Sequence, residues 1–281
     1  MIYDRRRMAV MGSWTLDDIP WERFDRSKVD PEILRIVKAA SLVEQNGGDY
    51  AVYLCNVFAE DADFQSVARR WGAEEIQHGQ ALGRWAMMAD PAFDHAAAAA
   101  RFTAGFRVPL EAEASVRGSR AGELVARCIV ETGTSSYYTA LAEATNEPVL
   151  KAICQHIAAD EFRHYKLFYT HLRRYLAADR IGLWGRLKIA LGRIAESEDD
   201  ELAYAYHAAN ENTAPYDRRR SADAYARRAY AVYRWHHVER GLAMVFNAVG
   251  LKPHGRLNLA VARLAWWGMQ RRAARLARAA A

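Results

Sequence analysis

Apolar residues recur at spacings of three and four along almost the whole chain, and no segment shows the convincing alternation of a β-strand. This pattern predicts an all-α protein. Prolines stand at or near the start of the first and fourth predicted helices, which suits the first helical turn. The predicted helices cover residues 31–60, 62–89, 119–144, 147–178, 184–212, 222–249 and 256–278.

The predicted helices divide the chain into three parts. We expect an N-terminal extension over residues 1–29, a four-helix bundle over 30–178, and additional C-terminal helices over 179–281 that pack on the bundle. With 281 residues, 51% of them apolar and 26% charged, the chain fits the ordinary globular class and can bury a sizeable core. The sequence has no apolar run near 18 residues and no leader-like start, so the expected compartment is the cytoplasm.

The net charge of +5 is unevenly distributed. All residues after Arg240 include seven basic groups and no acid, whereas the first 240 carry 32 basic and 34 acidic groups. The basic balance therefore belongs to the tail, and we expect no nucleic-acid binding. The three cysteines form no Cys-x-x-Cys pair, which favours reduced core thiols and excludes a rubredoxin-type or zinc-ribbon site.

Two short motifs repeat the same spacing in different helices. "AEEIQHG" at 73–79 and "ADEFRHY" at 159–165 each contain Glu-x-x-His. Residues three apart project from one face of a helix, so Glu75 and His78 can grip one ion, and Glu161 and His164 can do the same. A single Glu-x-x-His is usually a solvated surface pair, and the second copy is what makes a shared site the better interpretation.

Two further acids occupy positions where an apolar residue is expected. Glu44 in the first bundle helix and Glu131 in the third both lie on apolar stripes. Four buried carboxylates would repel one another and need cations to be stable. One Glu from each of two helices plus one Glu-x-x-His from each of two others is the ligand set of di-metal four-helix bundles. The predicted metal ligands are Glu44, Glu75, His78, Glu131, Glu161 and His164.

The acid directly before each motif glutamate has a predicted role of its own. Asp160 precedes Glu161, and an acid at this position can accept the free ring N–H of a ligating histidine and fix its tautomer. Glu74 precedes Glu75 in the same way. For Glu74, a solvated position on the far side of its helix stays open as the alternative.

At these residues the chain resembles the ferritin-like di-iron superfamily over roughly residues 30–178. "EEIQHG" and "DEFRH" look like the Glu-Glu-x-x-His-Gly and Asp-Glu-x-Arg-His motifs of soluble acyl-ACP desaturases. The resemblance implies that Thr134, three residues after Glu131 in "VETGT", lies beside the oxygen-binding face. The other interpretation of Thr134 is a hydrogen bond back to the carbonyl of Val130. The glutamate spacing alone is equally similar to that of aldehyde-deformylating oxygenases.

Other branches of the superfamily fit less well. Leu82 stands where a ribonucleotide reductase small subunit carries its radical tyrosine, and Ile157 stands where arylamine oxygenases add a third histidine. The Cys-x-x-Cys iron domain usual in rubrerythrins is missing from the sequence. A plain ferritin would not need the hundred or so residues that follow Ala178.

The resemblance implies a non-haem di-iron oxidoreductase that activates O2 or peroxide to oxidise a small apolar or carrier-bound acyl substrate. Two iron ions are the implied cofactors, and manganese at one or both positions stays open because the same ligands suit it. Electrons would come from an external donor, a ferredoxin-like protein or a flavoprotein reductase, since no flavin, nicotinamide or iron–sulfur motif is visible. Two alternatives remain: a ferritin- or rubrerythrin-like ferroxidase or iron-binding protein without an organic substrate, and a redox-silent bundle with a structural metal.

Several residues outside the ligand set carry two interpretations each. Gly47 and Gly48, one turn after Glu44, either open room for a substrate chain or a helix bulge beside the metals, or let two helices pack closely. The tyrosines near the motifs are expected to be core aromatics rather than radical carriers. His236 and His237 lack a partner set and are expected at the surface.

The basic tail contains Trp266 and Trp267 among its arginines. This composition suits a helix lying on an anionic membrane. However, Arg272 falls on the opposite side of the helix from Arg263 and Arg256, so the arginines do not share one face. Packing across the bundle or against a second subunit, as in a homodimer, is therefore favoured over peripheral membrane contact.

Overall fold

The computed structural model describes residues 14–196, 200–211 and 213–279. The structure is 80% helical and its described residues form no strand, which confirms the all-α prediction. Residues 1–13 of the predicted N-terminal extension, and residues 197–199 and 212 of the fifth predicted helix, lie outside the described residues. The α-helices are α1 (Pro31–Gln45), α2 (Gly47–Val57), α3 (Ala62–Ala89), α4 (His95–Gly105), α5 (Arg120–Ala144), α6 (Pro148–Asp179), α7 (Leu183–Glu196), α8 (Asp200–Asn210), α9 (Arg218–Val232), α10 (Trp235–Val249) and α11 (Arg256–Ala279).

Side-chain caps explain why the predicted boundaries of α3, α5 and α6 are accurate to within about one residue. Asp61 accepts a hydrogen bond from the backbone N–H of Phe64 at the start of α3. Ser119 and Glu147 cap α5 and α6 in the same way, and Pro148 follows Glu147 at the first helical position. These local signals are short-range, so the sequence alone reveals them.

Two predicted helices are wrong because each is two helices. The predicted helix 31–60 is interrupted at Asn46, between α1 and α2, directly before the glycine pair. The described residues of the predicted helix 184–212 lie in α7 and α8, and residues 197–199 between them are outside the described residues. The predicted helix 222–249 divides into α9 and α10, where Tyr233 and Arg234 adopt extended backbone angles and the N–H of Arg234 donates to His237 Nδ1 at 2.9 Å.

One helix, α4, is missing from the predicted set. Its sequence "HAAAAARFTAG" offers few large apolar residues, so its period is weak. Asp94 caps it by accepting from the N–H of Ala97, and only Ala98 and Phe102, one turn apart, are buried.

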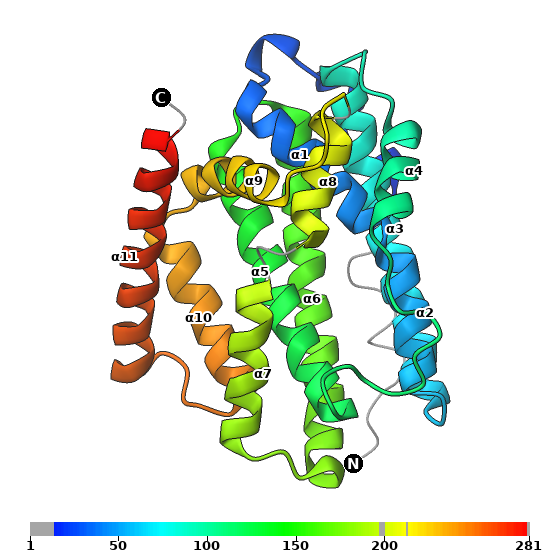
Figure 1. Ribbon diagram of the computed structural model, residues 1–281, viewed down its shortest axis with the longest axis vertical. Coiled ribbons are helices and arrows are strands. Elements are labelled where there is room, and N and C mark those ends of the chain that lie inside the picture. Colours follow the sequence, from blue (N-terminus) through cyan, green and yellow to red (C-terminus); the bar gives the residue numbers. More distant parts are fainter. Residues whose placement is uncertain (1–13, 197–199, 212, 280–281) are drawn as a thin grey trace.

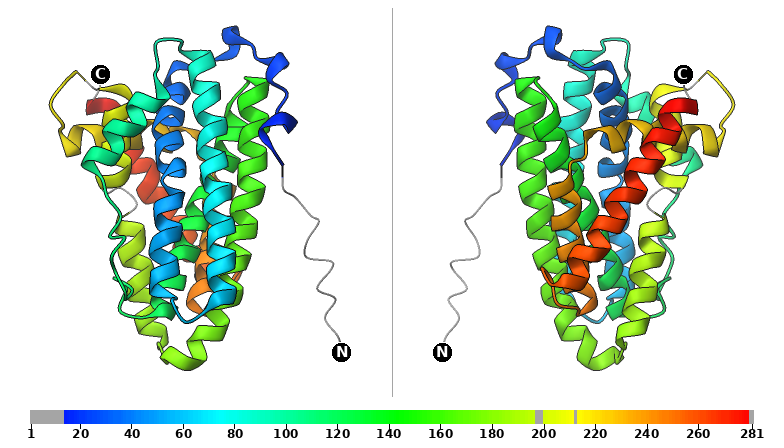
Figure 2. Two further views of the ribbon diagram at one scale, coloured as in Figure 1. Left: turned by 90° about the vertical axis from the view of Figure 1, so that its right-hand side faces the viewer. Right: turned by 90° about the vertical axis from the view of Figure 1, so that its left-hand side faces the viewer.

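Four rods form the bundle that positions the candidate site (Figures 1 and 2). The α1–α2 rod packs on α3. Helix α5 packs on α6 more extensively than any other pair of described helices does. The C-terminal helices cover the outer side of α1 and α5: α8 lies on α1, whereas α7 and α10 lie on α5. Helix α11 is outermost and contacts α9 and α10.

Glycine allows the α1–α2 rod to approach α3 very closely. A Cβ at Gly47 would lie 2.2 Å from Glu75 Cβ, and one at Gly72 would lie 2.5 Å from Ala51 Cβ. Of the two interpretations of Gly47, close helix packing is therefore correct. The contact matters for the site because Glu44 and Glu75 project from these two rods.

Helix α11 packs on the molecule through one side only. Asn258 and Ala262 are buried, whereas Leu257, Leu264 and Trp267 are more than half exposed. Among the described residues, no helix is both long and apolar enough to cross a membrane. Contact of this helix with a second subunit or with a membrane surface stays a prediction.

Candidate metal centre

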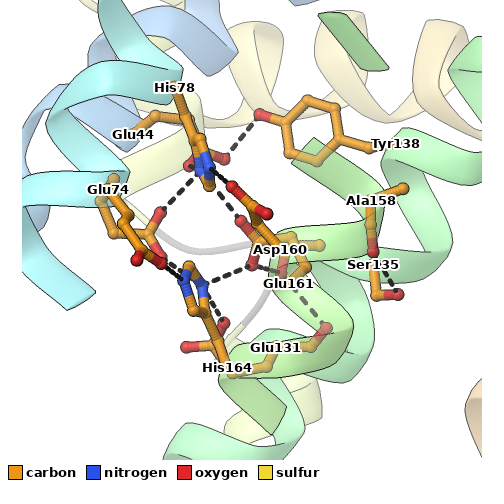
Figure 3. Close-up of polar contacts among 12 residues, drawn as sticks. Glu44, Glu74, His78, Glu131, Ser135, Tyr138, Ala158, Asp160, Glu161 and His164 are labelled. Atoms are coloured by element: carbon orange, nitrogen blue, oxygen red, sulfur yellow. Dashed lines mark hydrogen bonds and ion pairs between the residues drawn. The ribbon is translucent and has the colours of Figure 1, made fainter. Parts of the chain in front are cut away.

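The six predicted ligands converge at the middle of the bundle, from α1, α3, α5 and α6. In Figure 3 the two imidazoles point toward each other with the carboxylates around them, and their ring centroids are 5.9 Å apart. None of the six residues is more than 6% exposed. Such complete burial of four acids and two histidines requires a compensating interaction.

The first group of ligands surrounds His78. Its Nδ1 atom lies 3.5 Å from Glu44 Oε2, 3.4 Å from Glu75 Oε2 and 3.2 Å from Glu161 Oε1. One ligand atom from each of these four residues lies within 4.8 Å of the others. The four residues can therefore surround a single ion.

The second group surrounds His164. Its Nδ1 atom lies 3.0 Å from Glu75 Oε1, 3.6 Å from Glu131 Oε2 and 3.9 Å from Glu161 Oε2. These four residues also offer ligand atoms within 4.8 Å of one another. Glu75 and Glu161 belong to both groups, so they would help to hold either of two ions, whereas Glu44 and Glu131 would each help to hold one.

Unpaired atoms show that the centre fits a pair of cations. Within the described part of the chain, no hydrogen-bond partner exists for Glu75 Oε1, Glu161 Oε1, either carboxylate oxygen of Glu131, or the Nδ1 atoms of His78 and His164. Buried polar atoms normally find a partner, and here the unpaired ones are lone-pair donors. Four carboxylates and two neutral imidazoles would balance the charge of two divalent ions.

Electrostatics lead to the same conclusion. Burial raises the pKa of Glu44 and Glu131, and the neighbouring carboxylates raise both further. Burial alone would lower the pKa of His78 and His164, but the acids hydrogen-bonded to each ring outweigh it and raise the pKa well above the usual value. The carboxylates thus stabilise positive charge at the centre of the bundle.

The outer nitrogen of each imidazole contacts an acid from the opposite helix. His78 Nε2 lies 3.1 Å from Asp160 Oδ2, and His164 Nε2 lies 2.7 Å from Glu74 Oε2. Since ionised carboxylates only accept, each Nε2 carries a proton, and Nδ1 is the atom that would donate its lone pair to a bound metal ion. Glu74 is therefore not a merely solvated residue, although its side chain is 21% exposed.

Two further residues complete this network: Trp14, which the sequence did not suggest, and Arg163, the arginine of the DEFRH motif. Trp14 Nε1 donates to Asp160 Oδ2 at 2.8 Å, and its ring stacks on that of His78 at 6.0 Å. Arg163 Nη2 lies 2.5 Å from Asp160 Oδ1 and 3.4 Å from Glu74 Oε2. Burial would raise the pKa of Asp160, but its bonds to His78 and Arg163 outweigh this and lower it. We name Trp14, Glu74, Asp160 and Arg163 the histidine-orienting network.

Thr134 makes the contacts expected from both interpretations of its sequence position. Its Oγ1 lies 2.6 Å from Glu161 Oε2, and 3.3 Å from the carbonyl oxygens of Val130 and Glu131. The single hydroxyl proton has its shortest contact with Glu161. Thr134 therefore lies directly against a shared carboxylate, and a part in the reaction stays a prediction.

Tyr138 also contacts the centre. Its hydroxyl donates to Glu44 Oε1 at 2.5 Å, and burial raises the pKa of the phenol well above its usual range. Tyr137 and Tyr165 are buried core aromatics as well. Tyr138 thus keeps its proton and fixes one oxygen of Glu44.

The surface position predicted for His236 and His237 is wrong for one of them. His237 is 2% exposed, and its Nε2 lies 3.1 Å from Glu143 Oε2. His236 contacts the same carboxylate with a half-exposed side chain. Because His237 Nδ1 accepts the N–H of Arg234, its Nε2 carries the proton, which explains this trio as a hydrogen-bonded tie between α5 and α10.

Comparison with known proteins gives one result that bears on the centre. No curated protein matches the chain. Residues 54–183, 130 of the 281, match the sequence profile of a family described as fatty acid desaturase. The matched segment includes five of the six clustered ligands and both acids of the histidine-orienting network, but not Glu44. The match supports an oxidoreductase that acts on fatty acyl substrates.

Proposed function

We propose that the protein is a non-haem di-iron oxidoreductase that uses O2 or peroxide to oxidise an apolar or acyl-type substrate. The observation that carries the proposal is the set of buried, unpaired ligand atoms that face one another from four helices. The match to the fatty acid desaturase profile supports an organic substrate over simple iron oxidation.

Six residues would hold the two ions. Glu75 and Glu161 lie close to both imidazoles and would be shared, whereas Glu44 with His78 and Glu131 with His164 would complete one ion each. Bound iron would supply the electron-transfer chemistry that reduces O2 or peroxide, which protein side chains cannot supply themselves. Carboxylate and imidazole ligands also suit manganese, so metal analysis of the purified protein identifies the bound ion.

The chain's own residues would orient and seal the centre. Asp160 and Glu74 fix the histidine tautomers, and the burial of all six ligands excludes bulk water. The Thr134 hydroxyl, 2.6 Å from Glu161, is placed to hold or move a proton at that carboxylate. Electrons would come from an external ferredoxin-like or flavoprotein donor.

Metal analysis with substrate-dependent oxygen uptake tests this function. Protein purified after iron-supplemented expression should contain two transition-metal ions per chain, and a stoichiometry well below one would refute the site. Oxygen uptake by the reduced protein should rise with an acyl substrate and give an oxidised product. Rapid oxidation of Fe(II) that ignores every acyl compound would instead establish the ferroxidase alternative.

A further inference from the structure

Two buried polar residues stand one helical turn before two of the candidate ligands. Trp71 is four residues before Glu75 on α3, and Arg127 is four residues before Glu131 on α5. Residues four apart share a helix face, and four residues advance about 6 Å along the axis. Both helices run upward in Figure 1, so Trp71 and Arg127 lie on the same end of the centre. The Arg127 Cζ is 6.0 Å from the Trp71 ring centroid.

Arg127 carries a buried charge that no carboxylate of the described residues pairs closely, although its Cζ lies 4.9 Å from the centroid of the Tyr50 ring. The residue is 6% exposed, and its Nε atom has no hydrogen-bond partner among the described residues. The nearest carboxylate oxygen to Nε is Glu123 Oε1, at 3.7 Å. Glu123 cannot readily move closer, because its other oxygen accepts from Tyr53 at 2.9 Å and from Ser115 at 2.8 Å. A guanidinium left this way is unfavourable unless something else pairs with it.

Two more N–H groups also have no hydrogen-bond partner in the described part of the chain: the indole Nε1 of Trp71, a residue 4% exposed, and the Nε of Arg193 on α7. Arg193 is close to Arg127: burial and then the Arg127 charge lower the pKa of Arg193. Arg193 reaches Glu196 only at 4.0 Å, and Arg117 binds that carboxylate at 2.6 Å. We name Trp71, Arg127 and Arg193 the donor cluster. Its three members are donors only, so the group that fits them must be an acceptor.

The nearby acid does not fill that role. Glu201 on α8 accepts from the Tyr50 hydroxyl at 3.0 Å and from Asn46 Nδ2 at 3.4 Å. Burial raises the pKa of Glu201, so this carboxyl offsets less positive charge than an ordinary glutamate. The two arginines are therefore left with positive charge that the surrounding protein compensates weakly.

From this geometry we infer that the donor cluster binds the carboxylate of the substrate, beside the metal centre. A carboxylate is an acceptor only, is negatively charged, and matches the planar fork of a guanidinium, whereas water would satisfy the hydrogen bonds but not the charge. As a statement about substrate, the inference rests on the proposed function. It names a free carboxylic acid with an apolar chain, oxidised close to its carboxyl end, in preference to an acyl chain esterified to a carrier.

Calorimetric titration of the full-length protein with three probes tests the inference. Decanoate carries both chain and charge, decanamide keeps the chain without the charge, and acetate keeps the charge without the chain. Decanoate should bind at least about tenfold more tightly than decanamide, as expected when a charged acceptor is lost. Titrating metal-free protein, and then Fe(II)-loaded protein without oxygen, separates this site from carboxylate binding to the metals themselves.

Variants of the cluster identify the residues responsible. Arg127→Met keeps the length of the side chain and should weaken decanoate binding by about ten- to a hundredfold, with decanamide unchanged. Trp71→Phe removes only the N–H and should weaken it by about three- to tenfold. Arg101→Met is the matched control, because Arg101 binds the carbonyl of Ala208 on the far helix pair α4–α8 and should not affect decanoate binding.

The outcomes separate this inference from the proposed function. Equal affinity of metal-free wild type and Arg127→Met for decanoate would overturn it, as would equal affinity of wild type for decanoate and decanamide. If decanoate binding depends on Arg127 but the protein takes up no iron, the carboxylate site stands and the oxidoreductase proposal fails. If the protein takes up iron and oxidises decanamide as fast as decanoate, the oxidoreductase proposal stands and the carboxylate site fails.

Discussion

The two polar surroundings of the centre differ in how completely their atoms are paired. In the histidine-orienting network, Asp160 alone accepts from Trp14, His78 and Arg163 within 3.1 Å. In the donor cluster, Arg127 Nε lies 3.7 Å from Glu123 Oε1 and Arg193 Nη1 lies 4.0 Å from Glu196 Oε2, and neither Nε atom has a hydrogen-bond partner in the described chain. Hydrogen bonds within the protein hold the residues of the first network in place. The N–H groups of the donor cluster lack such partners in the described chain and can donate to a ligand.

Replacing Glu161 with Ala should have the largest effect. Glu161 belongs to both ligand groups and contacts both imidazoles, so its loss removes one ligand from each ion. We expect nearly complete loss of bound metal and of oxygen uptake together, with helix content by circular dichroism almost unchanged because the bundle is long. Glu143→Ala, which alters a carboxylate on α5 outside the centre, is the control. If Glu161→Ala keeps all of its iron, the assignment of the metal site to these six residues is wrong.

Replacing Asp160 with Asn should have the next largest effect and tests the paired network. The amide keeps the shape of Asp160 but removes the charge that holds the Nε2 proton of His78, so metal affinity should fall about ten- to a hundredfold. Competition with a chelator measures it. Glu74→Gln should act in the same direction but less, because Glu74 is 21% exposed whereas the Asp160 side chain is 4% exposed. If both variants bind metal as tightly as the wild type, the histidine-orienting network contributes to packing and not to metal binding.

Thr134→Val should leave metal content unchanged and slow the reaction. The hydroxyl contacts Glu161 at 2.6 Å, and its loss removes one hydrogen bond from a shared carboxylate, worth about a tenfold change in rate or less. Single-turnover product formation by the reduced, oxygen-exposed protein is the measurement. If Thr134 only bonds back to its own helix, Thr134→Val and wild type will show the same rate.

The six ligands and the place of Asp160 beside them were predictable from the sequence, and the reason is local spacing. Glu75 and His78 stand three apart, Asp160 directly precedes Glu161, and helix geometry alone places such neighbours on predictable faces. Which histidine each acid would contact was not predictable, because the pairing of Asp160 with His78 crosses between α3 and α6. Trp14 was missed for the same reason, since 146 residues separate it from Asp160.

The donor cluster could not be predicted from the sequence. Its members come from α3, α5 and α7, and nothing in the spacing of Trp71, Arg127 and Arg193 indicates that they meet. Periodicity places Arg127 on the same face as Glu131, but an arginine in a helix is usually a solvated residue. Its burial depends on α7 covering α5, a contact between helices far apart in the sequence that periodicity does not reveal.

The smallest expected effect is on stability, and it contrasts two arginines directly. Arg163 is tied to Asp160 and Glu74, so Arg163→Met should lower the free energy of unfolding by about 1 kcal/mol, a modest value because its side chain is 36% exposed. Arg127 is buried, contacts the Tyr50 ring at 4.9 Å and has no carboxylate oxygen of the described residues closer than 3.7 Å, and exchanging such a charge for a similar apolar volume is often neutral or stabilising, so Arg127→Met should hold or raise the melting temperature. Thermal unfolding of both variants, metal-free and without fatty acid, measures the difference. A fall for Arg127→Met as large as that for Arg163→Met would mean that Arg127 already has its partner inside the protein, and the two surroundings of the centre would then be alike.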